Sequence, residues 1–301
     1  MHARKLQDTA LRYFLEVIRS GSLAEASARL HVAASAISRQ IHGLEEALGI
    51  TLFERQPRGM VPTAAGEILA AYARRSAMEA ERAIEDIEAL QGLRLGSVRI
   101  ATTEGFSRHV LPLLIVEFRK RFERIVFEVT VESPANVPVR LREGDAEIGL
   151  TFSRAPEKDI RVELQHPSPI LALMHPQHPL ADSKTLTLSR LREYPIALPL
   201  PETTLRQMID IVCSRQQLHL QVVLTSNATG TLHGFVMEGG GIAVSGEVSV
   251  LHLVASGAMV AIPIRDRGMD LRDIELQTLA GRALPHAAQS FLKHLKTRLP
   301  E

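Results

Sequence analysis

Apolar positions in the first 63 residues return at the spacing of three short helices. From residue 8 to residue 20 they recur every three or four positions, as in a helix that buries one face, and Gly21 ends the run. Ser22 and Glu25 form a capping box that starts a second helix. After a break at residues 31–32, a third helix has these apolar residues on one face: Ile37, Ile41, Leu44 and Leu48. Two short helices joined by a tight turn, behind a supporting helix, predict a helix-turn-helix.

A small hairpin is expected directly after these helices. Residues 51–55 and 59–61 fit two short strands, and the Gln-Pro-Arg-Gly sequence between them is typical of a turn. The sequence therefore predicts a winged helix-turn-helix domain that binds DNA over residues 1–63.

Residues 64–92 have the pattern of one long helix, with Thr63 as a possible cap and Gly92 at the end. Small and apolar residues alternate spacings of three and four along it, which is a heptad seam: Ala73, Ser76, Ala80, Ala83, Ile87 and Leu90. A helix lying on its own domain would instead have a broader apolar stripe. We therefore expect a linker helix that forms a dimer contact through Ala73, Ala80, Ala83, Ile87 and Leu90.

From residue 93 on, short strands alternate with helices, which is typical of α/β domains with a mostly parallel sheet. One set of elements covers residues 93–165 and is completed by residues 267–301, and a second set covers residues 166–266. The predicted fold class is α+β multidomain: an N-terminal winged helix-turn-helix, a long linker helix and a C-terminal α/β domain (residues 93–301) of two subdomains.

The composition fits an ordinary globular protein, with 45% hydrophobic and 23% charged residues in 301. We see neither a secretory leader nor an apolar run of membrane-spanning length. The single cysteine, Cys213, excludes an internal disulfide framework and suits a reducing compartment. We therefore expect a cytoplasmic protein.

Several segments resemble the LysR-type transcriptional regulators, in the order in which that family carries them. In the N-terminal part they are residues 38–41 (Ser-Arg-Gln-Ile), 44–45 (Leu-Glu), 48–49 (Leu-Gly), 52–55 (Leu-Phe-Glu-Arg), 58–59 (Arg-Gly) and 63–66 (Thr-Ala-Ala-Gly). Residues 178–181 (His-Pro-Leu-Ala) and 239–242 (Gly-Gly-Gly-Ile) resemble the family's loop and turn sequences. The resemblance covers essentially the whole chain. It implies a transcriptional regulator that acts as a homodimer or homotetramer, with a periplasmic-binding-protein-like effector domain that binds a small molecule between its two subdomains.

The start of the second helix of a helix-turn-helix enters the major groove, where base edges can be distinguished. Here that helix begins near Ala34, and its polar residues project away from Ile37 and Ile41. Arg39 can bind a guanine edge or a phosphate, and Ser38 fits a phosphate contact. Together with the arginines of the wing, the residues expected to contact double-stranded promoter DNA are Ser35, Ser38, Arg39, His42, Arg55 and Arg58.

The chain departs from the family just before this helix. The family usually has a serine and a base-reading glutamine there, and this chain has Ala33 and Ala34. The helix thereby loses a polar N-cap worth about 1 kcal/mol and one bidentate reader of adenine. We expect a different sequence preference, with more weight on thymine methyl contacts and DNA shape.

The charge balance of residues 1–63 bears on how DNA is bound. Lys/Arg at positions 4, 5, 12, 19, 29, 39, 55 and 58 outnumber Asp/Glu at positions 8, 16, 25, 45, 46 and 54 by two. Since the whole chain has a net charge of only +1, we expect affinity to come from several subunits bound together.

Hydroxyl residues follow several predicted strands of the C-terminal domain, where ligands of open α/β sheets bind. The expected effector-binding residues are Thr102, Thr103, Thr151, Phe152, Thr203, Thr204 and Asn227. Hydroxyls beside helix N-termini suit an anion, so this pattern favours a carboxylate as the effector. Glu104, next to the first pair, favours instead a ligand with an amine. Each threonine can equally be a helix cap.

Other chemical signals have simpler explanations. Cys213 has no resolving partner, and His175 and His178 lie in a proline-rich loop without further metal ligands. The glycines at 239–241 lack the lysine of a phosphate-binding loop, and Asp145 and Glu147 fit a structural role beside a short strand. We therefore expect no catalytic residues, no metal and no cofactor.

Two alternatives are a cytoplasmic solute-binding protein and an enzyme on the same two-subdomain scaffold. The first leaves residues 1–63 without a purpose. The second needs a nucleophile, an acid–base pair or a metal, and the expected cleft offers hydroxyls and amides.

Overall fold

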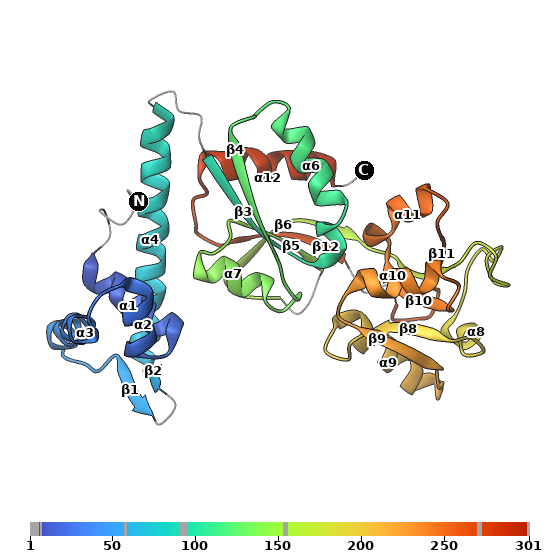
Figure 1. Ribbon diagram of the computed structural model, residues 1–301, viewed down its shortest axis with the longest axis horizontal. Coiled ribbons are helices and arrows are strands. Elements are labelled where there is room, and N and C mark those ends of the chain that lie inside the picture. The colour runs from blue at the N-terminus through green and yellow to red at the C-terminus, as the bar shows by residue number, and fades with distance from the viewer. Residues whose placement is uncertain are drawn as a thin grey trace. The chain divides into compact units, whose positions relative to one another are not determined.

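The computed structural model describes residues 6, 8–56, 59–90, 96–152, 156–269 and 273–299, without the side chains of residues 55, 85 and 88–90 (Figure 1). The chain forms two compact units. One contains residues 1–95 and 282–286, and the other contains residues 96–281 and 287–301. The main division therefore falls just after the segment expected to form the linker helix.

The first unit is helical, with one small hairpin (Figure 1). Its elements are α1 (Thr9–Ser20), α2 (Leu23–Leu30), α3 (Ala34–Leu48), β1 (Phe53–Gln56), β2 (Gly59–Pro62) and α4 (Ala64–Leu90). The side chain of Asp8 caps α1, and that of Ser22 caps α2 by accepting the N–H of Glu25 at 3.1 Å. Gly21 separates these helices with a φ of +71°, a conformation that glycine adopts at low cost. The predicted helices and wing are confirmed.

The apolar faces of these helices meet in one core. Phe14 and Leu52 are fully buried, and the rings of Phe14 and Phe53 are 5.1 Å apart. The Oγ1 of Thr63 accepts the N–H of Gly66 at 3.1 Å and so caps α4. Residue 66 must be glycine because a Cβ there would overlap the carbonyl of Leu52. The start of α4 is therefore packed closely against the wing.

The second unit contains two five-stranded sheets, the first in the order β4-β3-β5-β12-β6. Its strands are β3 (Gly96–Thr102), β4 (Ile125–Val131), β5 (Ile148–Phe152), β6 (Ile160–Pro167) and β12 (Asp273–Leu279). Its helices are α5 (Glu104–Ser107), α6 (Val110–Arg119), α7 (Val137–Glu143) and α12 (His286–Arg298) (Figure 1). The ring of Phe118 on α6 lies 5.0 Å from that of Phe291 on α12. Aromatic packing therefore joins the two helices, one from each end of the unit's sequence.

The second sheet has the order β11-β7-β10-β8-β9. Its strands are β7 (Ile170–Met174), β8 (Ile196–Pro199), β9 (Val222–Ser226), β10 (Ile242–Gly246) and β11 (Val260–Pro263). Its helices are α8 (Leu188–Leu191), α9 (Thr204–Gln216), α10 (Thr229–Met237) and α11 (Leu251–Ala255). Strands β7 and β10 are buried at every position, which is the pattern of central strands covered on both faces.

The sheets are less parallel than the sequence predicted. Strand β3 runs parallel to β4 and β5, and β8 runs parallel to β9 and β10. Strands β7 and β12 are the first after the chain crosses from one sheet to the other, and each runs antiparallel to both of its neighbours. The parallel strands nevertheless remain together in each sheet, and their carboxyl ends position the site described below.

Candidate DNA interface and ligand cavity

Helix α3 has one buried face and one exposed polar face. Ile37 and Ile41 are buried in the core of the first unit. Ser35, Arg39 and His42 are exposed, and Ser38 is half-buried at the edge. Four of the six residues expected to contact DNA therefore lie along one accessible side of this helix.

The start of α3 has no side-chain cap. Its N-cap is Ala33 in an extended conformation, and neither Ala33 nor the next two residues are buried. The N–H of Ala36 donates to the Ala33 carbonyl at 2.9 Å, whereas Ala34 and Ser35 are exposed and their backbone N–H groups are available to an anion such as a DNA phosphate.

Contacts between α3 and the hairpin hold the wing in place. The backbone N–H of Leu52, just before β1, donates to Glu45 Oε1 at 2.8 Å. Arg55 pairs with Met60 in the strand ladder, but its side chain, like all of Arg58, lies outside the described residues. The wing's backbone is thus placed, and the contacts of its two arginines remain expectations.

The expected dimer seam on α4 is divided. Ala73 is 2% exposed within the single chain, so it has no surface for a partner. Ala80 is half-buried and Ala83 and Ile87 are exposed, whereas the side chain of Leu90 lies outside the described residues. Exposed apolar side chains also occur at Ile68 and Tyr72, one turn apart. The accessible apolar face of α4 therefore includes Ile68, Tyr72, Ala83 and Ile87, and Ala73 belongs to the interior.

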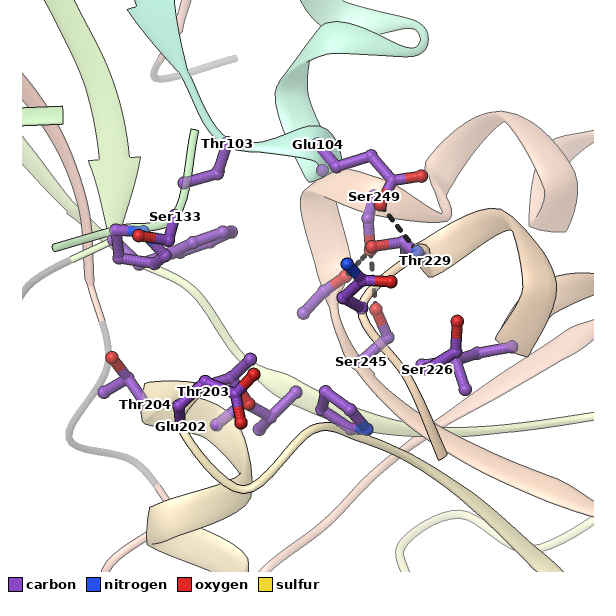
Figure 2. Close-up of a pocket in the computed structure, with 18 of the residues that line it drawn as sticks. Thr103, Glu104, Ser133, Glu202, Thr203, Thr204, Ser226, Thr229, Ser245 and Ser249 are labelled. Carbon is purple, nitrogen blue, oxygen red and sulfur yellow. Dashed lines mark hydrogen bonds between the residues drawn. The ribbon is translucent and has the colours of Figure 1, made fainter. Parts of the chain in front are cut away.

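In the second unit, the carboxyl ends of six strands surround a cavity of about 410 Å³ (Figure 2). These are β3, β4 and β5 of the first sheet and β8, β9 and β10 of the second. Hydroxyl side chains dominate its polar lining: Thr103, Ser133, Thr203, Thr204, Ser226, Thr229, Ser245 and Ser249. A cavity of this size, enclosed by two sheets and lined by polar groups, fits a small organic ligand.

Five of the seven residues expected to bind the effector line this cavity: Thr103, Phe152, Thr203, Thr204 and Asn227. The other two, Thr102 and Thr151, are fully buried and are not part of the described lining. The hydroxyl of Thr102 donates to the carbonyl of Leu150 at 3.0 Å, which ties β3 to β5. Thr203 is also a helix cap, as its position in the sequence allows. Its Oγ1 accepts the N–H of Arg206 at the start of α9.

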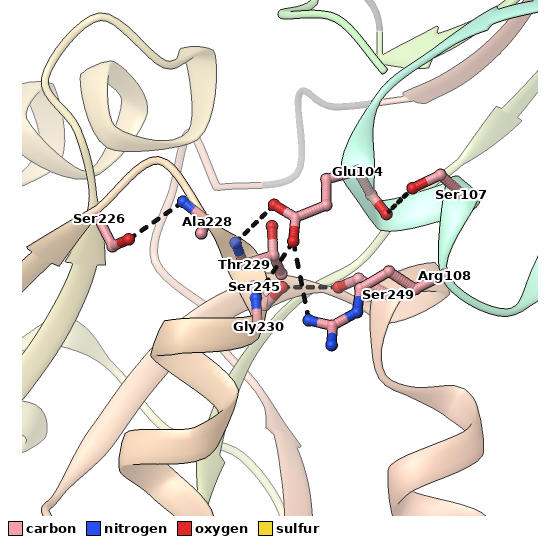
Figure 3. Close-up of polar contacts among 9 residues, drawn as sticks. All are labelled: Glu104, Ser107, Arg108, Ser226, Ala228, Thr229, Gly230, Ser245 and Ser249. Carbon is pink, nitrogen blue, oxygen red and sulfur yellow. Dashed lines mark hydrogen bonds and ion pairs between the residues drawn. The ribbon is translucent and has the colours of Figure 1, made fainter. Parts of the chain in front are cut away.

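Glu104 connects the two halves of the second unit (Figure 3). Its carboxylate accepts the backbone N–H of Thr229 at 2.6 Å and that of Gly230 at 3.3 Å, and so caps α10. Arg108 lies 3.7 Å from the same carboxylate. A Cβ on residue 230 would overlap the Arg108 guanidinium, so the flexible end of that arginine side chain would have to move for any larger residue. The N-cap residue of α10 is Ala228, which has no side chain that can cap it. The cap is therefore Glu104, which follows β3 of the first sheet, whereas α10 belongs to the second sheet.

Charged groups near the cavity are mostly held by partners. Glu132 accepts the Arg140 guanidinium at 2.6 Å, and Arg140 also pairs with Asp145 at 3.0 Å. The hydrogen bonds that Arg140 donates to these carboxylates raise its pKa, so it stays charged. His233 on α10 is 3% exposed, and burial followed by the nearby Arg108 lowers its pKa to about 4. It is therefore neutral at pH 7.

Sequence reasoning missed Glu132, Ser133, Glu202, Ser226, Ser245 and Ser249 as cavity residues. Glu132, Ser133 and Ser226 carried the same signal as the threonines, because they end or follow a strand. Ser245 carried it too, because it follows the apolar run at residues 242–244 that predicts a strand. Ser249, whose hydroxyl lies 2.7 Å from that of Ser245, gave no such signal.

Cys213 is buried on α9. Burial raises the pKa of its thiol, which disfavours the reactive thiolate. Within the part of the chain that the structure describes, no three His, Cys, Asp or Glu side chains gather as metal ligands, and no helix is long and apolar enough to cross a bilayer.

A winged helix-turn-helix in one unit and a two-sheet unit with a polar cavity define a ligand-responsive DNA-binding regulator. Residues 9–67 match the family model "Bacterial regulatory helix-turn-helix protein, lysR family", and residues 91–300 match "LysR substrate binding domain". The chain therefore belongs to the LysR family of transcriptional regulators, and it is a regulator rather than an enzyme.

Whole-length relatives agree with this assignment. The chain is 27% identical over 298 residues to the transcriptional activator protein LysR of Escherichia coli (strain K12), which covers 97% of this chain and 93% of that protein. A full-length OxyR variant from Pseudomonas aeruginosa has a TM-score of 0.69 at 20% identity, covering 96% of this chain and 94% of that one. Full-length CbnR complexed with its target DNA has a TM-score of 0.58 at 20% identity, covering 99% of each chain. At these identities the two structures show a shared fold.

Proposed function

We propose that α3 recognises the operator through Ser35, Arg39 and His42, with Ser38 on a phosphate. The observation that carries this proposal is the polar, exposed face of a helix whose opposite face is locked in the core. Arg39 has the fork of donors that binds a guanine edge, and the uncapped N–H groups at the start of α3 suit a phosphate. Arg55 and Arg58 of the wing contact the flanking backbone or groove.

The working unit is a homo-oligomer in the cytoplasm. One helix-turn-helix with a small excess of positive charge makes too few phosphate contacts for stable binding at cellular salt. Helix α4 supplies an exposed apolar face at Ile68, Tyr72, Ala83 and Ile87 that a second copy would cover. Pairing there places two recognition helices on one DNA duplex.

The cavity of the second unit binds a small-molecule effector. Both sheets contribute to its walls, so a ligand inside can bridge them. An effector changes transcription only if it binds two arrangements of the protein with different affinity. Thr103, Thr203, Thr204 and Asn227 are the contacts expected from the sequence, and Thr102 supports them from the strand behind.

The test begins with selection of a binding site from random duplex DNA by the purified full-length protein. The selected site and a scrambled site are then titrated at several salt concentrations with wild type and Arg39→Ala. We expect the variant to lose about 10- to 100-fold in affinity for the selected site and far less for the scrambled one, as for the loss of a bidentate base contact.

Arg215→Ala is the matched control, because Arg215 is an exposed arginine on α9 in the other unit. Equal losses in the two variants would show only a general charge effect. Unchanged binding of Arg39→Ala would remove α3 from the interface.

A further inference from the structure

The charged groups that line the ligand cavity have one sign. The described lining contains three glutamates, Glu104, Glu132 and Glu202, and it contains no lysine, arginine or histidine. Figure 2 shows Glu104 and Glu202 on opposite sides of the opening. The described lining therefore offers no cation to a negatively charged ligand, and Glu202 would repel it.

The start of α10 would be the natural place for an anionic ligand, but it is already filled. The carboxylate of Glu104 accepts the N–H groups of Thr229 and Gly230 at 2.6 and 3.3 Å. These donors and the positive end of the helix dipole are the features that hold ligand carboxylates in other sites. Here the chain's own carboxylate uses them, and Arg108 is engaged by the same group.

Neither of the other two glutamates has a cation beside it in the described lining of the cavity. Glu132 is neutralised by Arg140, which does not belong to the lining. Glu202 is exposed just before α9, and among the described residues no cation lies within ion-pair distance of it. Thr203 already caps the start of α9, so an anion there would have to lie beside Glu202. Glu202 is thus the carboxylate that remains available to a ligand.

One buried hydroxyl adds an independent sign of a ligand. Thr103 is 5% exposed and lines the cavity, yet its Oγ1 has no hydrogen-bond partner in the structure. A buried polar atom without a partner is costly, and a ligand group that bonds to it removes the cost. A hydroxyl beside carboxylates can accept a hydrogen bond from an N–H group of a bound cation.

From these observations we propose that the effector is a small organic cation, with a protonated amine directed at Glu202 and a donor directed at Thr103. This inference rests on the proposed function of the cavity as the effector site. It replaces the carboxylate suggested by the threonine pattern with the opposite charge, because the N–H donors at the start of α10 already bind Glu104 and every charged side chain of the described lining is a carboxylate.

Three four-carbon probes test the charge preference at constant size: putrescine (two ammonium groups), 4-aminobutyrate (one of each charge) and succinate (two carboxylates). Each is titrated into the full-length protein while the unfolding temperature is measured, since a ligand of the folded state raises that temperature in a saturable way. We expect putrescine to bind most tightly and succinate least. Glu202→Gln should weaken putrescine binding about tenfold, as for the loss of a charged hydrogen bond.

Two further variants make the result specific. Glu193→Gln removes a carboxylate from an exposed position outside the cavity lining and should leave putrescine binding unchanged. Thr103→Val keeps the side-chain shape but removes the unpartnered hydroxyl, and it should weaken putrescine binding several-fold.

Tighter binding of succinate that Thr103→Val abolishes would overturn the cation and leave the cavity as an effector site. Absence of stabilisation by putrescine would also overturn it. If none of the three probes stabilises the protein and a metabolite extract yields no compound retained by wild type but lost in Thr103→Val, the effector site itself fails.

Discussion

Helices α3 and α10 both begin after an alanine in an extended conformation, Ala33 and Ala228, without a cap from their own N-cap residue. Their surroundings differ. The start of α10 is covered by the carboxylate of Glu104, which comes from 125 residues away in the sequence. The start of α3 is exposed to solvent. The same local deficiency is corrected inside the fold in one case and left open in the other.

This difference separates groups that serve the fold from groups that remain available to a partner. The start of α10 is half-buried, so N–H groups left unsatisfied there would destabilise the protein, and Glu104 satisfies two of them. At the surface, water satisfies the same groups, and a phosphate can replace the water. The same contrast recurs on α4, where Ala73 is buried within the chain and Ile87 is 53% exposed.

The largest effect is expected from a charge on the open side of α4. Ile87→Glu should convert the oligomer to monomers and abolish stable operator binding, because a carboxylate cannot be buried in an apolar interface without a large free-energy cost. Sedimentation and DNA titration measure the two consequences. Val162→Glu places the same charge at an exposed apolar position on β6, and this control should leave assembly unchanged. An intact oligomer in Ile87→Glu would place the dimer contact elsewhere.

The covered side of α10 predicts a pH effect through His233. Burial, with Arg108 nearby, lowers its pKa from 6.5 to about 4 in the folded state. Between these pH values the unfolded chain binds a proton that the folded chain does not. The free energy of unfolding therefore has its full value above pH 6.5 and falls as the pH drops toward 4. From pH 7 to pH 5 this group should remove about 2 kcal/mol.

Urea unfolding of wild type and His233→Gln at both pH values isolates this contribution. His252, whose pKa burial also lowers, titrates in both proteins and cancels in the difference. If wild type and His233→Gln lost the same free energy of unfolding between pH 7 and pH 5, the prediction would be wrong. His233 would then bind a proton in the folded protein as readily as in the unfolded chain.

The contrast between the two helix starts also marks how far the sequence could be interpreted. Local signals were sufficient for the helix-turn-helix of the first unit: the Ser22 cap, the Gly21 break and the apolar faces of α1 to α3 all involve residues close in the chain. In the second unit the continuous apolar runs at residues 170–174 and 242–244 predict strands, and these are β7 and β10. Edge strand β6, which is largely exposed, was not predicted.

Helix α10 escaped prediction for a related reason. Its sequence contains Gly230 and Gly234 and apolar residues without a helical period, so it lacks the propensity and the pattern that reveal a helix. Its stability comes from packing and from Glu104. The position of Glu104 beside Thr103 was visible in the sequence, but its partner at residue 229 was not, because nothing local encodes a contact between the two sheets.

Removing the distant cap should have a moderate effect. Glu104→Ala should destabilise the second unit by about 1 kcal/mol, the usual cost of a lost N-cap. Glu104→Gln keeps an oxygen that can accept the N–H of Thr229 and should retain most of the stability. Urea unfolding of both variants at pH 7 gives the comparison. If the glutamine variant is as unstable as the alanine variant, the ion pair with Arg108 matters and the cap does not.

The smallest effect tests the comparison most directly, by giving each helix a polar N-cap of its own. Serine fits the extended backbone at both Ala33 and Ala228, and its hydroxyl can accept an N–H of the first turn. In Ala33→Ser the exposed N–H of Ser35 can donate to the new hydroxyl, so the start of α3 should gain about 1 kcal/mol, or roughly fivefold slower hydrogen exchange of that amide. In Ala228→Ser the N–H groups of Thr229 and Gly230 already donate to Glu104, and exchange at the start of α10 should remain unchanged. In the double variant with Ala228→Ser and Glu104→Ala, the N–H groups no longer donate to Glu104. The serine should then slow hydrogen exchange at the start of α10. Equal protection from serine at both positions in the otherwise wild-type protein would mean that Glu104 does not cap α10 in solution.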